Sequence, residues 1–101
     1  MSKLIHSPVD KFPGDVTLFN PVPYPAYIEW EKALVFEGEV SDLTKQQAMF
    51  KGARAMVEKW EIPTFDIANP PAAPNRTAII NLLAWLVTEI GIVINGESDP
   101  N

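Results

Sequence analysis

The chain has 101 residues, 47% of them hydrophobic and 21% charged, with a formal net charge of −5 and no cysteine. This length and composition predict one folded domain with a hydrophobic core. The absence of cysteine excludes disulfides and fits an intracellular setting. The negative charge argues against non-specific binding to nucleic acid and against docking on anionic membranes.

Residues 1–13 are predicted to form a loose arm, because Ser7-Pro8 and Phe12-Pro13-Gly14 interrupt the backbone. No signal peptide is expected, since charged residues flank the short apolar pair Leu4-Ile5. His6 is the only histidine and has no evident acidic partner, so we expect a solvated side chain rather than a ligand or a base. A zinc site needs several His or Cys ligands, which this chain cannot supply.

Residues 14–19 alternate apolar and polar side chains, which predicts a short strand. Residues 20–25, NPVPYP, then break regular structure. They fit either a polyproline-type ligand or a rigid connector, and we favour a connector with Pro25 in the first turn of a helix. That helix is expected over residues 26–36, with Gly38 ending it.

A second helix is predicted from a cap at Ser41 or Asp42 to about Glu61. Its basic residues could meet an acidic partner or, as we favour, pair with acidic residues of the first helix: Lys45, Lys51, Arg54 and Lys59. Gly52 in its middle costs about 1 kcal/mol relative to alanine, which would fit close helix packing. Residues 63–67, PTFDI, are expected to form a second strand paired with residues 16–19.

Residues 77–95, TAIINLLAWLVTEIGIVIN, form the most apolar segment and predict a third helix. At 3.6 residues per turn, one broad face gathers large aliphatic side chains: Ile79, Leu82, Leu83, Leu86, Ile90 and Val93. The opposite face gathers small or polar ones: Thr77, Asn81, Ala84, Thr88, Gly91 and Asn95. On one flank Trp85 and Ile92 lie beside Glu89.

This helix carries more apolar surface than an ordinary surface helix and must be covered on several sides. We therefore predict that Trp85, Ile92 and Glu89 bind a partner helix or a second copy of the chain. The alternative is that residues 20–25 cover Trp85 internally. A membrane span over residues 78–94 is not predicted, because the segment is short and contains Glu89. Residues 96–101 are expected to be a frayed tail.

The chain shows no convincing catalytic signature. Its five glycines are isolated, which leaves no phosphate-binding loop, and its serines have no evident base. Carboxylates from different elements could still meet in a polar cleft, and this leaves a small enzyme as an open alternative. We predict no enzyme, no cofactor and no metal.

Three stretches together resemble the small tail assembly chaperones of long-tailed bacteriophages and their prophage relatives. They are PGDVTLFNPVPYPAYIEWEKAL (13–34), MVEKWEI (56–62) and LLAWLVTEIGIVINGE (82–97). The likeness is one of layout and short runs over most of the chain after Phe12. It implies a mostly helical, non-catalytic protein of the infected bacterial cytoplasm that keeps the tape measure protein soluble and helps to recruit tail-tube subunits.

The residues and the resemblance together predict a mainly α, compact three-helix domain with a minor two-stranded β-ribbon. The predicted function is a non-catalytic binding protein, with a self-associating structural or scaffold subunit as the alternative. The expected partners are another protein or a second copy of the chain, and neither nucleic acid nor membrane.

Overall fold

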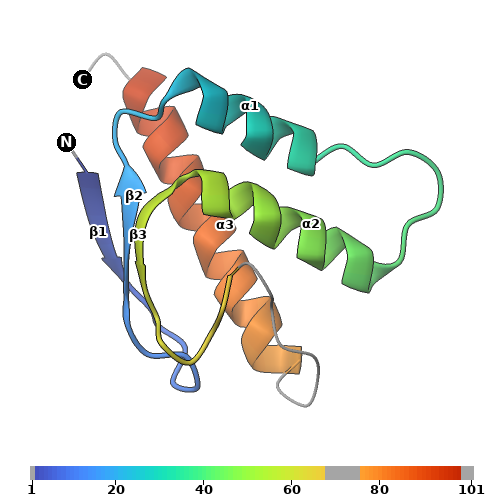
Figure 1. Cartoon of the computed structure of the whole chain (residues 1–101), viewed down its shortest axis with the longest axis horizontal. Coiled ribbons are helices and arrows are strands. Elements are labelled where there is room, and N and C mark those ends of the chain that lie inside the picture. Colours follow the sequence, from blue (N-terminus) through green and yellow to red (C-terminus); the bar gives the residue numbers. More distant parts are fainter. Residues whose placement is uncertain (1, 68–75, 99–101) are drawn as a thin grey trace.

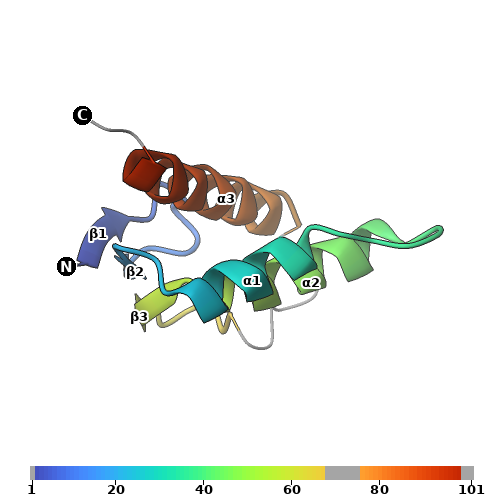
Figure 2. The ribbon, with the colours of Figure 1, turned by 90° about the horizontal axis from the view of Figure 1, so that it is seen from above.

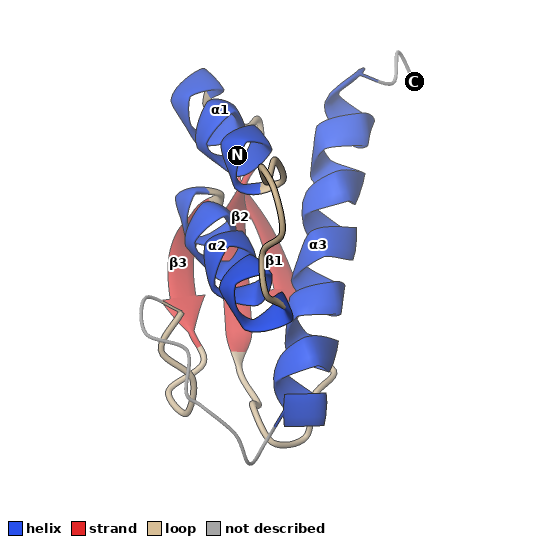
Figure 3. Cartoon of the chain, turned by 90° about the vertical axis from the view of Figure 1, so that its right-hand side faces the viewer, coloured by secondary structure: helices blue, strands red, loops and turns tan. Residues whose placement is uncertain are grey.

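The computed structural model describes residues 2–67 and 76–98 of the chain. These residues contain an antiparallel sheet of three strands and, in addition, three helices (Figure 1). The strands lie side by side in the order β1-β2-β3, and the helices lie against one face of the sheet (Figure 3). In chain order the elements are β1 (Ser2–His6), β2 (Asp15–Phe19), α1 (Tyr24–Ala33), α2 (Asp42–Ala55), β3 (Val57–Glu61) and α3 (Arg76–Ser98).

This mixed α/β fold shows that the prediction of a three-helix domain with a two-stranded ribbon was wrong. The predicted loose arm contains β1, which pairs with β2 from Ser2 opposite Phe19 to His6 opposite Asp15. Ile5 of this strand is buried against the core, and so is Phe12 in the connection that follows. The N-terminal segment is therefore anchored by a strand pairing and by two buried side chains.

The predicted second helix ends six residues early, because residues 57–61 form β3 instead. A bulge in the β2–β3 pairing explains the error. Thr17 lies opposite Lys59, whereas the next residue, Leu18, lies opposite Val57, so Glu58 is an extra residue. The bulge lets Val57 and Trp60, three positions apart, both face the core, which is the spacing that a helix would also give.

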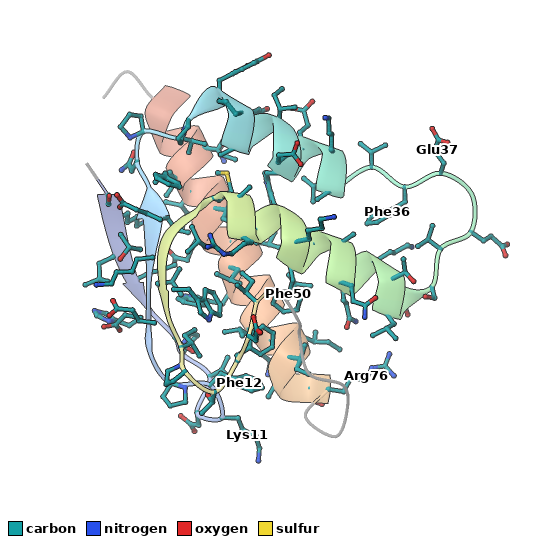
Figure 4. The ribbon with its side chains drawn as sticks, viewed as in Figure 1. Lys11, Phe12, Phe36, Glu37, Phe50 and Arg76 are labelled. Atoms are coloured by element: carbon teal, nitrogen blue, oxygen red, sulfur yellow. The ribbon has the colours of Figure 1, made fainter. Side chains whose placement is uncertain are left out.

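The predicted strand over residues 63–67 is also wrong, since this segment is a turn that folds back against the core. Phe65 is fully buried there, and its carbonyl oxygen accepts a hydrogen bond of 2.8 Å from Nε1 of Trp60. Its ring lies 5.0 Å, centroid to centroid, from the rings of both Phe12 and Phe50. Figure 4 shows Phe50 beside α2 and Phe12 below it, near the connection between β1 and β2.

The helical hairpin of α1 and α2 follows its local signals. Pro25 lies in the first turn of α1, as predicted, and the backbone N–H of Thr44 donates to the hydroxyl of Ser41 at the start of α2. Gly52 faces α1, where an added Cβ would collide with Cβ of Ala33 and lie 3.3 Å from the ring of Trp30. The absence of a side chain at Gly52 therefore permits the close contact between the two helices.

The third helix was predicted well. Its buried residues are the six assigned to one broad face from the sequence: Ile79, Leu82, Leu83, Leu86, Ile90 and Val93. It extends to Ser98, so residues 96–98 of the predicted frayed tail belong to the helix. The predicted cap at Asn75, the connection over residues 69–75 and the tail residues 99–101 lie outside the described residues.

Candidate interaction surface on α3 and β1

The solvent side of α3 carries no charge over about five turns, from Thr77 to Asn95. Its exposed side chains are small, polar but uncharged, or aliphatic: Thr77, Ile80, Asn81, Ala84, Thr88, Ile92 and Asn95. Ile80 and Ile92 keep 39% and 49% of their surface in contact with solvent. The exposed sides of α1 and α2 differ, because both carry acidic and basic residues. We call this surface the uncharged face of α3.

The three predicted partner-binding residues lie together on the flank of α3 that turns toward β1. A carboxylate oxygen of Glu89 lies 3.4 Å from Nζ of Lys3 in β1, which fixes the direction of this flank. At 100° per residue, Trp85 and Ile92 lie within 40° and 60° of Glu89 around the helix. Trp85 is half-buried against the core and Ile92 is exposed. Figure 2 shows α3 on the β1 side of the molecule, with α1 and α2 toward β3.

Glu89 therefore has an internal partner, which the sequence did not indicate. Its ion pair with Lys3 joins α3 to the edge strand, and both side chains are mostly shielded from solvent. An ion pair in this position orients β1 relative to the helix. It leaves Trp85 and Ile92 as the apolar part of the flank.

The outer edge of β1 is a second feature of this side of the molecule. The backbone N–H of Ser7 donates to the carbonyl oxygen of Gly14 at 2.9 Å, in register with the β1–β2 ladder. Because hydrogen-bonded and non-hydrogen-bonded pairs alternate in an antiparallel ladder, Lys3 and Ile5 bond to β2. The N–H and C=O groups of the alternate residues, Ser2, Leu4 and His6, point away from the sheet. No other described strand lies beyond them.

The two edges of the sheet differ in chemistry. β3 carries the charged residues Glu58, Lys59 and Glu61, and the turn after it folds back through Trp60. Charged edge strands of this kind discourage pairing with other chains. β1 has no acidic residue, its Lys3 is paired with Glu89, and Leu4 on the face away from the helices is 54% exposed. The β1 edge is thus the less protected one.

The polar residues on the exposed face of the sheet form pairs that remain open to water. Nδ1 of His6 lies 2.6 Å from a carboxylate oxygen of Asp15, whose neighbour across the ladder is Glu61. The His6 side chain is 73% exposed, as predicted, but the expectation that it lacks an acidic partner was wrong. Within residues 2–67 and 76–98, no group of three His, Cys, Asp or Glu side chains could hold a metal ion.

The ion pairs of the described residues do not join α1 to α2. They are Lys3–Glu89, His6–Asp15, Lys32–Glu29 and Lys59–Glu61. Lys59 belongs to β3, and Arg54 donates to the backbone oxygen of Val57. The internal pairing that we favoured for the basic segment is therefore not found among the described residues.

A second group of exposed apolar side chains lies at the far end of the α1–α2 hairpin. Leu34, Val35 and Leu43 are 44%, 68% and 63% exposed. Figures 1 and 4 show this connection, with Phe36 and Glu37, projecting away from the sheet. Unlike the uncharged face of α3, this group alternates with acidic residues, including Glu37 and Glu39.

By length and composition alone, α3 is the one described helix that could cross a membrane, over residues Arg76–Gly96. The core helix of a soluble domain meets the same criterion, and α3 has such a core face, which includes Leu82, Leu86 and Ile90. The helix length therefore does not by itself distinguish a membrane span from a core helix.

No protein-family model matches the chain, and neither a curated protein nor a solved structure matches it. The chemistry of the α3 and β1 surfaces is therefore the basis on which a function is proposed below.

Proposed function

We propose that the protein is a non-catalytic binding protein that covers apolar helical segments of a partner protein. The tail assembly chaperones that the sequence resembles are thought to act on the tape measure protein in this way, in the cytoplasm of the infected bacterium. The observation that carries the proposal is the uncharged face of α3, which is exposed along the length of the helix. The exposed sides of α1 and α2, in contrast, carry both acidic and basic residues.

The side chains on this face fit a helix better than a small polar ligand. Ala84, Thr88 and Gly91 are small and would let a partner helix approach closely, while Ile80 and Ile92 stand on either side as apolar contacts. Burial of apolar surface contributes about 25 cal/mol per Å². A specific interface of standard size covers about 800 Å² on each partner, so a partner would have to contact most of α3.

The alternative is a small structural or scaffold subunit that is built permanently into an assembly. The open edge of β1 favours this alternative, because an unprotected edge strand pairs readily with other strands. A reversible chaperone should stay soluble and of limited size at high concentration. A structural subunit should continue to assemble as its concentration rises.

The proposal can be tested with a fragment of a long-tailed phage tape measure protein that aggregates on dilution from denaturant. Light scattering should show that the wild-type chain keeps the fragment soluble. Ile80→Glu and Ile92→Glu should each raise the chain concentration needed to keep the fragment soluble by at least tenfold, since each places a carboxylate in the uncharged face of α3.

Leu43→Glu is the matched control, because it makes the same change at an exposed aliphatic residue of the α1–α2 hairpin. It should leave the protection unchanged. Loss of protection in Leu43→Glu alone would transfer the binding site to the hairpin. Aggregation of the fragment in the presence of the wild-type chain would contradict the chaperone role.

A further inference from the structure

We propose that two copies of the chain pair through β1, antiparallel and with a two-fold axis at Leu4, so that their sheets join into one of six strands. The pairing itself depends only on β1 and the flank of α3. Its consequence for partner binding rests on the function proposed above. The occupant of the open edge is thus a second copy of this chain.

The register follows from the backbone groups that point outward. Ser2, Leu4 and His6 present their N–H and C=O groups at the edge, as the bonding pattern of Ser7 with Gly14 implies. Centring the pair on Leu4 places each Leu4 opposite Leu4 of the second copy, and each Ser2 opposite the second His6. Every outward backbone group of the strand then has a partner, which a shifted register does not achieve.

The side chains are compatible with this register. On the exposed face of the sheet, the two Leu4 side chains, each 54% exposed, would cover one another. On the helix side, Lys3 would lie opposite Ile5 of the second copy, so that no like charges face each other directly. Lys3 keeps its ion pair with Glu89 of its own chain. β1 carries no acidic residue, although the chain as a whole is acidic, so this pairing brings no carboxylates of the two strands opposite each other.

The α3 flank extends the contact beyond the five residues of the strand. A two-stranded ribbon alone is marginally stable, so an edge pairing needs further buried surface. Trp85 and Ile92 lie on the flank that turns toward β1, and therefore toward the second copy. Both α3 helices would lie on the same side of the joined sheet, with their uncharged faces adjacent. A partner protein would then meet a surface twice as wide as one chain offers.

Size-exclusion chromatography with light scattering, over a concentration series, measures the oligomeric state directly. We expect a monomer–dimer equilibrium that stops at the dimer. Hydrogen exchange gives the register. The amides of Lys3 and Ile5 should be protected at every concentration, and those of Leu4 and His6 only where the dimer is populated.

Leu4→Pro removes an outward N–H without removing a bond to β2, and an edge position of this kind tolerates proline. It should raise the dissociation constant of the dimer at least tenfold. Leu4→Lys keeps the N–H but places two positive charges opposite each other, and it should have a similar effect. Leu4→Gln, which is uncharged, is the matched control and should weaken the dimer less than Leu4→Lys. Circular dichroism establishes that each variant is folded.

A monomer at all concentrations, with fast exchange at Leu4, would overturn the proposal. A dimer that survives Leu4→Pro and Leu4→Lys but is lost in Ile92→Glu would place the contact on α3 alone and also overturn it. Protection of Leu4 only after another protein is added would assign the edge to an extended segment of that protein. Ile80→Glu separates the two proposals, since this residue lies on the side of α3 away from Glu89. It should weaken partner binding at least tenfold and leave the dimer intact.

Discussion

The close contact between α1 and α2 at Gly52 predicts that replacing glycine by alanine has opposite effects on the free energy of unfolding at Gly52 and at Gly91. An alanine Cβ at position 52 would lie closer to Cβ of Ala33 than real Cβ atoms come, and 3.3 Å from Cε3 of Trp30. Neither Cβ can rotate away, so α1 and α2 would have to separate. Gly91 of α3 is the comparison, because nothing lies within 4 Å of the Cβ that an alanine would add there.

The expected magnitudes follow from two opposing terms. Replacing a glycine inside a helix by alanine stabilises the helix by about 1 kcal/mol. Overpacking a tight contact costs about 1–3 kcal/mol. Gly52→Ala should therefore lower the free energy of unfolding by up to about 2 kcal/mol, and Gly91→Ala should raise it by about 0.5–1 kcal/mol.

Urea denaturation followed by circular dichroism measures both variants at a concentration below that of any association. The double variant Ala33→Gly/Gly52→Ala should recover part of the loss, since it moves the single methyl group to the other helix. If Gly52→Ala stabilises the protein as much as Gly91→Ala does, the close approach of α1 and α2 does not exist.

Leu86→Ala should lower the free energy of unfolding by about 2–5 kcal/mol in the same urea assay, because Leu86 is completely buried, and a near-neutral result would mean that α3 is oriented differently. Trp85→Ala should weaken association more than folding, which is seen by comparing the change in the dissociation constant with the change in the urea midpoint. A larger effect on folding than on association would mean that Trp85 is a core residue only. The pKa of the Tyr27 hydroxyl is raised above its usual value of about 10, chiefly because the hydroxyl donates a hydrogen bond to the carboxylate of Glu31. The stability that this contributes is present below pH 10 and is lost as the pH rises through the folded-state pKa, since the unfolded chain gives up the proton first. Absorbance titration of Glu31→Gln should show the pKa of Tyr27 falling, and no change would exclude the hydrogen bond as the cause.

The sequence predicted α3 correctly because the signal for a buried helix is local. Six large aliphatic residues repeat at helical spacing within one segment, and all six are buried. The same spacing placed Trp85, Glu89 and Ile92 on one flank. What that flank faces depends on the ion pair of Glu89 with Lys3, 86 positions earlier in the chain, and no local pattern contains this information.

The sequence did not predict β3 because a bulge in this strand changes the alternation of its side chains. Val57 and Trp60 are three residues apart, which fits one face of a helix and the opposite faces of a regular strand. The extra residue, Glu58, restores both side chains to the core face of the strand. The alternation rule therefore failed at the one position where the pairing with β2 is irregular.

β1 was missed for a different reason, namely that only one of its side chains is buried. Ile5 alone faces the core, and Leu4 is more exposed than buried. The strand exists because its backbone pairs with β2, whose Val16 and Leu18 are buried. The open edge of the sheet, and with it half of the candidate surface, could not be inferred without knowing that β1 is a strand.

A charge placed in the uncharged face of α3 tests whether this face is a binding surface or an ordinary solvent-facing side of a helix. Thr88 is exposed at its centre, and its hydroxyl donates to the backbone oxygen of Ala84. Thr88→Lys replaces a poor helix former by a better one, so the isolated chain should be as stable as the wild type or slightly more stable in urea. It also places a charge that must lose its hydration in any interface, and binding of the tape measure fragment should weaken at least tenfold. Gln47→Lys, at an exposed position of α2, adds the same charge elsewhere and should leave binding unchanged. Equal binding by the wild type and both variants would mean that α3 faces only water.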